Sequence, residues 1–120
     1  MGATPEELAR TLVSRHAERR AREEARAEVL LDSLHREVSA LKRQGAVERV
    51  WLIGSLAWGH FGSGSDVDLV VQGVSEEFVP ALWDELTRRL RAPVDLLRIE
   101  TLDEGFAERV RSEGIALDDG

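Results

Sequence analysis

The chain has no cysteine among its 120 residues. This absence excludes disulfides, zinc–thiolate sites and cysteine nucleophiles, and it fits a reducing compartment such as the cytoplasm. The sequence also lacks any run that is long and apolar enough to cross a membrane, and its N-terminus lacks the apolar core of a signal peptide. We therefore expect a cytoplasmic protein that does not engage a membrane.

Basic residues are scarce in the second part of the chain. Residues 1–44 carry nine Lys/Arg and eight Asp/Glu, a net charge of +1, whereas residues 45–120 carry seven and fifteen, a net −8, and the two sum to the formal −7. An acidic surface repels the phosphates of long DNA or RNA, and it gains from binding Mg²⁺. The charge distribution therefore argues against a long nucleic acid as the partner.

The length and the 42% apolar content predict one small domain over residues 1–120. A helix is expected over 4–44, because Thr4-Pro5-Glu6-Glu7 has the composition of a capping box with proline at the first helical position. No glycine or proline interrupts residues 6–44, and Gly45 suits the position just after a helix end. Residues 45–120 are expected to form the catalytic core.

The two halves of this predicted helix differ in character. From Ser14 to Glu28 the only apolar side chains are alanines, and this half is expected to project or to pair with a second copy or a partner protein. Its contact line is predicted to begin with the side chains of Leu8, Leu12 and Val13. The second half carries an apolar stripe at helical spacing, which should pack on the core and consists of Leu30, Leu31, Leu34, Val38 and Leu41.

The core reads as alternating strands and helices, with a helical turn at Leu56–Gly59 and a Gly/Ser loop at Phe61–Ser65. Strands are predicted at Val47–Ile53, Val67–Val71 and Pro93–Ile99, and helices at Glu77–Arg91 and Leu102–Ser112. This order predicts an α/β (α+β) fold, with a mixed sheet of three or more strands flanked by helices. The side chains expected to point inward are Trp51, Leu82, Trp83, Leu86, Leu90, Phe106 and Val110.

Two carboxylates open the second predicted strand. Asp66 and Asp68 are two residues apart, so in a strand they project from the same side. Paired carboxylates of this kind can hold Mg²⁺, which proteins commonly bind through one or two carboxylates together with substrate phosphates. In the alternative interpretation Asp66 caps a turn and Asp68 is an exposed strand residue. An aspartate inside an apolar strand favours the metal site, because a buried carboxylate needs pairing or a metal.

The stretch Trp51–Val71 resembles the signature of the DNA polymerase β-like nucleotidyltransferase superfamily, in which Gly-Ser is followed after ten residues by Asp-x-Asp. The short chain is similar to the smallest branch, the minimal nucleotidyltransferases, over roughly residues 28–117. Trp58 stands where that branch usually has arginine. The residues that match its Gly-Ser-x-Ala-x-Gly run are Gly54, Ser55, Ala57 and Gly59.

The resemblance implies a site for two Mg²⁺ ions and ATP. Asp66, Asp68 and Asp95 would be the metal ligands, and Asp95, in Pro93-Val94-Asp95-Leu96-Leu97, would also be the general base. Gly54 and Ser55 would bind the nucleotide phosphates. Ser65 would orient Asp66 or contact phosphate, although a turn serine is an equally good interpretation. For Asp95 an alternative remains open, in which its carboxylate pairs with Arg49 or Arg98 across the sheet.

The resemblance further implies a function, because minimal nucleotidyltransferases are frequently the antitoxins of HEPN/MNT toxin–antitoxin pairs. It implies transfer of AMP from ATP to a tyrosine of a partner HEPN toxin, and this chain, which has no tyrosine, cannot modify itself in that way. Two alternatives stay open. One is a small-molecule, antibiotic-type nucleotidyltransferase that is completed by dimerisation, and the other is a non-catalytic module that binds a partner. A homo-oligomer through the N-terminal helix is a further expectation.

Overall fold

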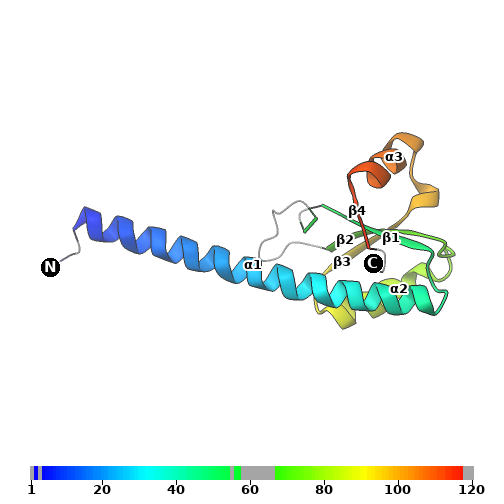
Figure 1. The fold of residues 1–120 in the computed structure, drawn as a ribbon, viewed down its shortest axis with the longest axis horizontal. Helices are drawn as coiled ribbons and strands as arrows, with labels where there is room; N and C mark the ends of the chain where they lie inside the picture. Colours follow the sequence, from blue (N-terminus) through cyan, green and yellow to red (C-terminus); the bar gives the residue numbers. More distant parts are fainter. Residues whose placement is uncertain (1, 3, 55, 58–66, 118–120) are drawn as a thin grey trace.

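The computed structural model describes residues 2, 4–54, 56–57 and 67–117 (Figure 1). Its elements are, in chain order, α1 (Pro5–Arg43), β1 (Arg49–Ile53), β2 (Val67–Gln72), α2 (Val79–Leu90), β3 (Val94–Arg98), the 3₁₀ turn η1 (Ile99–Thr101), α3 (Glu104–Glu113) and β4 (Ile115–Ala116). The strands form one sheet in the order β3-β2-β1-β4. β1 pairs antiparallel with β2 and with β4, while β2 pairs parallel with β3. The predicted α+β class with a mixed sheet and a long N-terminal helix is confirmed.

The ends of α1 follow from its local sequence. The Thr4 hydroxyl accepts a hydrogen bond from the Glu7 backbone N–H at 3.2 Å, and the Glu7 carboxylate accepts one from the Thr4 backbone N–H at 3.3 Å. This reciprocal pair is the predicted capping box, and it satisfies donors that the first turn would otherwise leave unpaired. Gln44 caps the C-terminus, and Gly45 follows with a positive φ of 74°.

The two halves of α1 have different surroundings. Every residue from Thr4 to Arg22 is exposed, and the exposed fractions of Leu8, Leu12 and Val13 are 52%, 63% and 70%. The second half buries Leu30, Leu34 and Val38. In Figure 1 the N-terminal half extends away from the sheet, and this gives the molecule its elongated outline of 65 × 30 × 27 Å.

The sheet separates two apolar layers. On one face the buried side chains of α1 and α2 pack against alternate strand residues, including Leu52, Leu69 and Leu96. On the other face Trp51 and Val70 pack with Ala107 and Val110 of α3, and with Ile99. Alternate side chains of a strand point to opposite faces, so each strand contributes to both layers. The predicted inward positions Trp51, Leu82, Leu86, Leu90 and Val110 are confirmed as buried.

Two predicted core positions are wrong. Trp83 and Phe106 are each 38% exposed. Trp83 lies about 100° around α2 from Leu82, because a helix has 3.6 residues per turn, and this places it on the flank of the buried stripe. In α3 the buried pair is Ala107 and Val110, which leaves Phe106 at the border of the contact.

Candidate active site

Two acidic side chains meet where β2 and β3 begin. In the parallel pairing of these strands, Asp68 is the register partner of Asp95. Register partners project from the same face, and neighbouring strands lie about 4.8 Å apart. Asp68 is partly buried and Asp95 is exposed. The structure therefore brings together two of the three predicted acidic residues, although they lie 27 residues apart in the sequence.

The burial of neighbouring residues identifies the face on which this acid pair lies. Val67 and Leu69 belong to the layer beneath α1 and α2, so Asp68 between them points to the opposite face. That face carries Val70, two residues further along β2, which packs against α3. The acid pair thus lies on the α3 side of the sheet, at the end where β2 and β3 begin.

The turn after β1 lies against Asp68, one member of the acid pair. Ile53, the last residue of β1, is the antiparallel partner of Asp68, and Gly54 follows it with a φ of +79°. A Cβ atom added at Gly54 would overlap the Asp68 carboxylate oxygen Oδ2. Glycine is required here on two counts, because the left-handed backbone disfavours other residues and the carboxylate occupies the space of a side chain.

The structural alternative for Asp95 can be tested against the two arginines. Arg49 is paired in register with Gln72, which lies four residues along β2 from Asp68, a separation of about 13 Å. The Arg98 side chain donates a hydrogen bond from Nε to the Val74 carbonyl at 2.7 Å. Arg98 is also three residues from Asp95 on β3, so the two side chains point to opposite faces. The strand register therefore argues against pairing of Asp95 with either arginine.

Three predicted site residues, Ser55, Ser65 and Asp66, lie outside the described residues. Within the ranges that the structure describes, which leave out Asp66, there is no group of three or more His, Cys, Asp or Glu side chains arranged to hold a metal. The donors that are described fit Mg²⁺ in type. Asp68 and Asp95 provide hard carboxylate oxygens, and Mg²⁺ is commonly bound by one or two carboxylates with water and phosphate oxygens filling the other positions.

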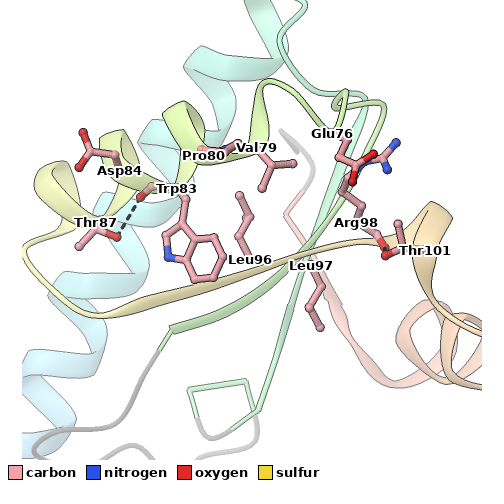
Figure 2. Close-up of a pocket in the computed structure, with 10 residues that line it drawn as sticks. All are labelled: Glu76, Val79, Pro80, Trp83, Asp84, Thr87, Leu96, Leu97, Arg98 and Thr101. Carbon is pink, nitrogen blue, oxygen red and sulfur yellow. Dashed lines mark hydrogen bonds between the residues drawn. The ribbon is translucent and has the colours of Figure 1, made fainter.

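Sequence reasoning missed an apolar groove of about 700 Å³ between α2 and β3. Figure 2 shows the side chains along it, and the apolar ones are Val79, Pro80, Trp83, Leu96 and Leu97. The position of Trp83 beside the buried stripe Leu82, Leu86 and Leu90 could have indicated this groove. An indole N–H at such a position needs a hydrogen-bond acceptor, which a neighbouring strand can provide. The Trp83 indole N–H finds that partner in the carbonyl of Val94 on β3.

The mixed sheet, the acid pair and the adjacent glycine turn agree with the nucleotidyltransferase fold. Residues 38–119 match the family model described as polymerase beta, nucleotidyltransferase. This match spans more than half of the chain, so the chain belongs to this nucleotidyltransferase family. The resemblance inferred from the Gly-Ser run, the Asp-x-Asp motif and the segment around Asp95 is thereby confirmed.

Solved structures with the same fold point to the minimal branch. A minimal nucleotidyltransferase structure is 28% identical with a TM-score of 0.64, and the match covers 74% of this chain and 93% of that one. A toxin–antitoxin structure with AMP-PNP is 21% identical with a TM-score of 0.61, covering 72% and 73%. A nucleotidyltransferase from Sulfolobus solfataricus is 25% identical with a TM-score of 0.51, covering 78% and 84%. No curated protein sequence matches the chain. Across the described residues, no helix is long and apolar enough to cross a membrane.

Proposed function

We propose that this nucleotidyltransferase transfers AMP from ATP to a tyrosine hydroxyl of a partner HEPN toxin, in a Mg²⁺-dependent reaction, and so acts as an antitoxin. The observation that carries the proposal is the register of β2 and β3, which sets Asp68 beside Asp95 next to the Gly54 turn. Two adjacent carboxylates repel each other, and a bound cation would offset that repulsion. The pair therefore suits the metal–triphosphate substrate of this family.

The choice of partner is supported by the similar structures. One is a toxin–antitoxin complex with AMP-PNP, and another is the toxin–antitoxin pair MntA-HepT, which is 19% identical with a TM-score of 0.53 over 72% of this chain and 70% of that one. The absence of tyrosine from the chain agrees with an acceptor on another protein. The charge of −8 over residues 45–120, from seven basic and fifteen acidic residues, opposes a long nucleic acid as the acceptor.

In the proposed site Asp66, Asp68 and Asp95 would hold two Mg²⁺ ions. When bound, such ions polarise the α-phosphate and stabilise both the attacking and the leaving oxygens. Asp68 would be held in its ligand position by its contact with Gly54. Gly54 and Ser55 would turn backbone N–H groups toward the β- and γ-phosphates. Ser65, one residue before Asp66, would orient that carboxylate.

The reaction itself is an in-line displacement at phosphorus. The acceptor hydroxyl oxygen forms a bond to the α-phosphorus, and the bond from the α-phosphorus to the bridging oxygen breaks. Pyrophosphate leaves with that electron pair. Asp95 is exposed on the open face and accepts the hydroxyl proton. An exposed general base suits an acceptor that another protein delivers.

Labelled ATP tests the proposal. The chain is incubated with Mg²⁺, a tyrosine-containing HepT-type toxin, and ATP labelled at either the α- or the γ-phosphate. We expect label on the toxin from α-labelled ATP alone, on a tyrosine identified by mass spectrometry, and no label with Asp68→Asn. Label from γ-labelled ATP would show phosphoryl transfer and would contradict the proposal. In a parallel reaction, transfer to a small-molecule antibiotic but not to the toxin would favour the small-molecule alternative.

A further inference from the structure

The groove between α2 and β3, called the β3 groove below, combines an apolar wall with an open sheet edge. Its floor and walls include Trp83 and Leu97, whose exposed fractions are 38% and 41%. Exposed large apolar side chains that line one concave surface are typical of a binding site. A volume of about 700 Å³ falls within the range of pockets for small ligands and short peptide segments.

Backbone groups face outward along the same groove. β3 is an edge strand of the sheet that the described residues form. The Pro93 carbonyl accepts a hydrogen bond from the Val67 N–H at 2.8 Å and so points toward β2. Strand residues alternate in direction, so Val94 and Leu96 point their N–H and C=O groups away from the sheet. Trp83 covers the Val94 carbonyl, and the groove continues past it to Leu96.

One residue that lines the β3 groove, Leu97, lies close to the acid pair. Leu97 lies two residues after Asp95 on β3, so the two side chains share one face of the sheet and are separated by about 7 Å. Leu96, between them, points to the α2 side and also lines the groove. A chain segment lying in the groove at Leu97 would therefore place a neighbouring residue within reach of Asp95.

The charges along the rim favour a basic partner. Glu76 and Asp84 stand on the α2 side of the groove, and Arg98 directs its guanidinium at the Val74 carbonyl. Asp84 also pairs with Arg88 at 3.1 Å, but both side chains are 71% exposed, and such surface pairs contribute little. The rim lies within residues 45–120, where seven basic and fifteen acidic residues give a net charge of −8.

We propose that the β3 groove binds an extended segment of the acceptor protein, with alternate apolar side chains in the groove and basic residues at its rim, and so guides the acceptor hydroxyl to Asp95. This inference rests on the proposed function, in which the acceptor is a protein. A second copy of this chain fits less well. A stable dimer buries about 800 Å² on each partner, which is more surface than a groove with room for a few side chains provides.

The test follows the indole N–H of Trp83 by NMR in the full chain, which has three tryptophans. The probe is a synthetic peptide that alternates leucine and threonine, carries one tyrosine, and ends in two arginines. We expect a saturable shift of the Trp83 signal, identified with Trp83→Phe, and no shift of Trp51, which is 3% exposed. The same peptide ending in two glutamates should bind about fivefold more weakly or worse.

Two matched variants separate the groove from the rest of the surface. Thr87 lines the groove and donates its hydroxyl to the Trp83 carbonyl at 2.9 Å, while Thr11 on α1 makes the same bond to the Glu7 carbonyl at 2.9 Å. Thr87→Arg should weaken peptide binding about fivefold or more, because it places bulk and positive charge in the groove. Thr11→Arg should leave it unchanged. Neither threonine belongs to the acid pair.

The outcomes distinguish this inference from the proposed function, because peptide binding needs neither Mg²⁺ nor ATP. Absence of a Trp83 shift, or equal binding by Thr87→Arg, overturns the groove proposal even where AMP transfer proceeds. A Trp83 signal that moves with protein concentration alone would assign the groove to self-association instead. In the transfer assay Thr87→Arg should raise KM for the tyrosine peptide with kcat and Mg²⁺-ATP affinity unchanged.

Discussion

At the scale of single residues, the site depends on strand register. Asp68 and Asp95 are adjacent because β2 and β3 are parallel and in register, with Val67 opposite Val94. A shift of one residue in either strand would send one carboxylate to the opposite face, beneath α1 and α2. The apolar residues on both sides of each aspartate hold that register, because their burial in the α1/α2 layer opposes such a shift.

Replacing Asp95 should separate turnover from binding. In the proposed reaction Asp95 accepts the hydroxyl proton, so Asp95→Asn should lower kcat by about 100-fold or more, while nucleotide affinity changes much less. Because Asp68 lies opposite, the variant also relieves a like-charge contact, and the metal-free protein should be no less stable than the wild type. Steady-state kinetics and urea unfolding measure the two effects. A variant that unfolds would instead assign Asp95 a structural role.

Gly54 and Gly45 offer a matched comparison, because both have positive φ, 79° and 74°. Alanine at either position should cost about 1–2 kcal/mol of unfolding free energy from backbone strain. At Gly45 a Cβ meets no atom within 4 Å, whereas at Gly54 it displaces the Asp68 carboxylate. We therefore expect Gly54→Ala, and not Gly45→Ala, to weaken Mg²⁺-dependent nucleotide binding. Equal affinities in a calorimetric titration would show that Gly54 does not position Asp68.

At the scale of elements, α1 has two separate tasks. Its second half supplies Leu30, Leu34 and Val38 to the core, so it is part of the fold. Its first half has the capping box and good helix formers but buries almost nothing in this molecule. Isolated helices are marginal in water, so an exposed half-helix that carries Leu8, Leu12 and Val13 suits pairing with a second copy or a partner.

Deleting residues 1–26 should test that division. The shortened chain keeps Ala27 and the buried part of α1, so its unfolding free energy should fall by no more than about 1 kcal/mol, the cost of losing the Thr4 cap. Mg²⁺-ATP binding should persist, and any self-association should weaken in sedimentation velocity. Loss of the fold would show that the first half of α1 is part of the core. If the distribution of sedimentation coefficients, corrected for mass, does not change, the first half of α1 is a solvated helix without a binding role.

The sequence predicts helices and strands well where the pattern of apolar residues extends over many residues and the capping residues are specific. The α1 boundaries follow from Thr4 and Gly45, and the strands that carry Asp68 and Asp95 were expected within about two residues at each end, as is usual for assigned boundaries. β4 was missed because two residues, Ile115–Ala116, carry no period of their own and pair only through β1. The exposure of Trp83 depends on the position of β3 beside α2, which local sequence does not specify.

At the scale of the whole molecule, the sheet order makes the site possible. β2 pairs antiparallel with β1 on one side and parallel with β3 on the other. The C-terminal end of β1 and the N-terminal ends of β2 and β3 therefore lie at the same end of the sheet. Gly54, Asp68 and Asp95 lie at this end. The acid pair at this end of the sheet was predicted from the family resemblance. Asp95 is 27 residues downstream of Asp68, and the residues around Asp95 do not by themselves indicate that the two aspartates are adjacent.

Among the described residues, Asp95 of the acid pair is exposed, and Leu97, two residues further along β3, lines the β3 groove. α3 covers the face over Trp51 and Val70, while Asp95 stays exposed. An exposed acidic residue of this kind can be reached by a hydroxyl group carried on another protein. The architecture of the described residues thus agrees with a partner that completes the site.

Calorimetric titration of ATP into the protein with Mg²⁺, and again with EDTA, tests the central claim most directly. We expect binding that requires Mg²⁺ and that falls by about tenfold or more in Asp68→Asn, because in the proposed site the acid pair holds the metal. Asp32→Asn, at an exposed carboxylate on α1, is the control and should bind as the wild type does. Binding that is equal with EDTA, or equal in Asp68→Asn and wild type, would contradict the assignment of Asp68 and Asp95 as the metal–nucleotide site.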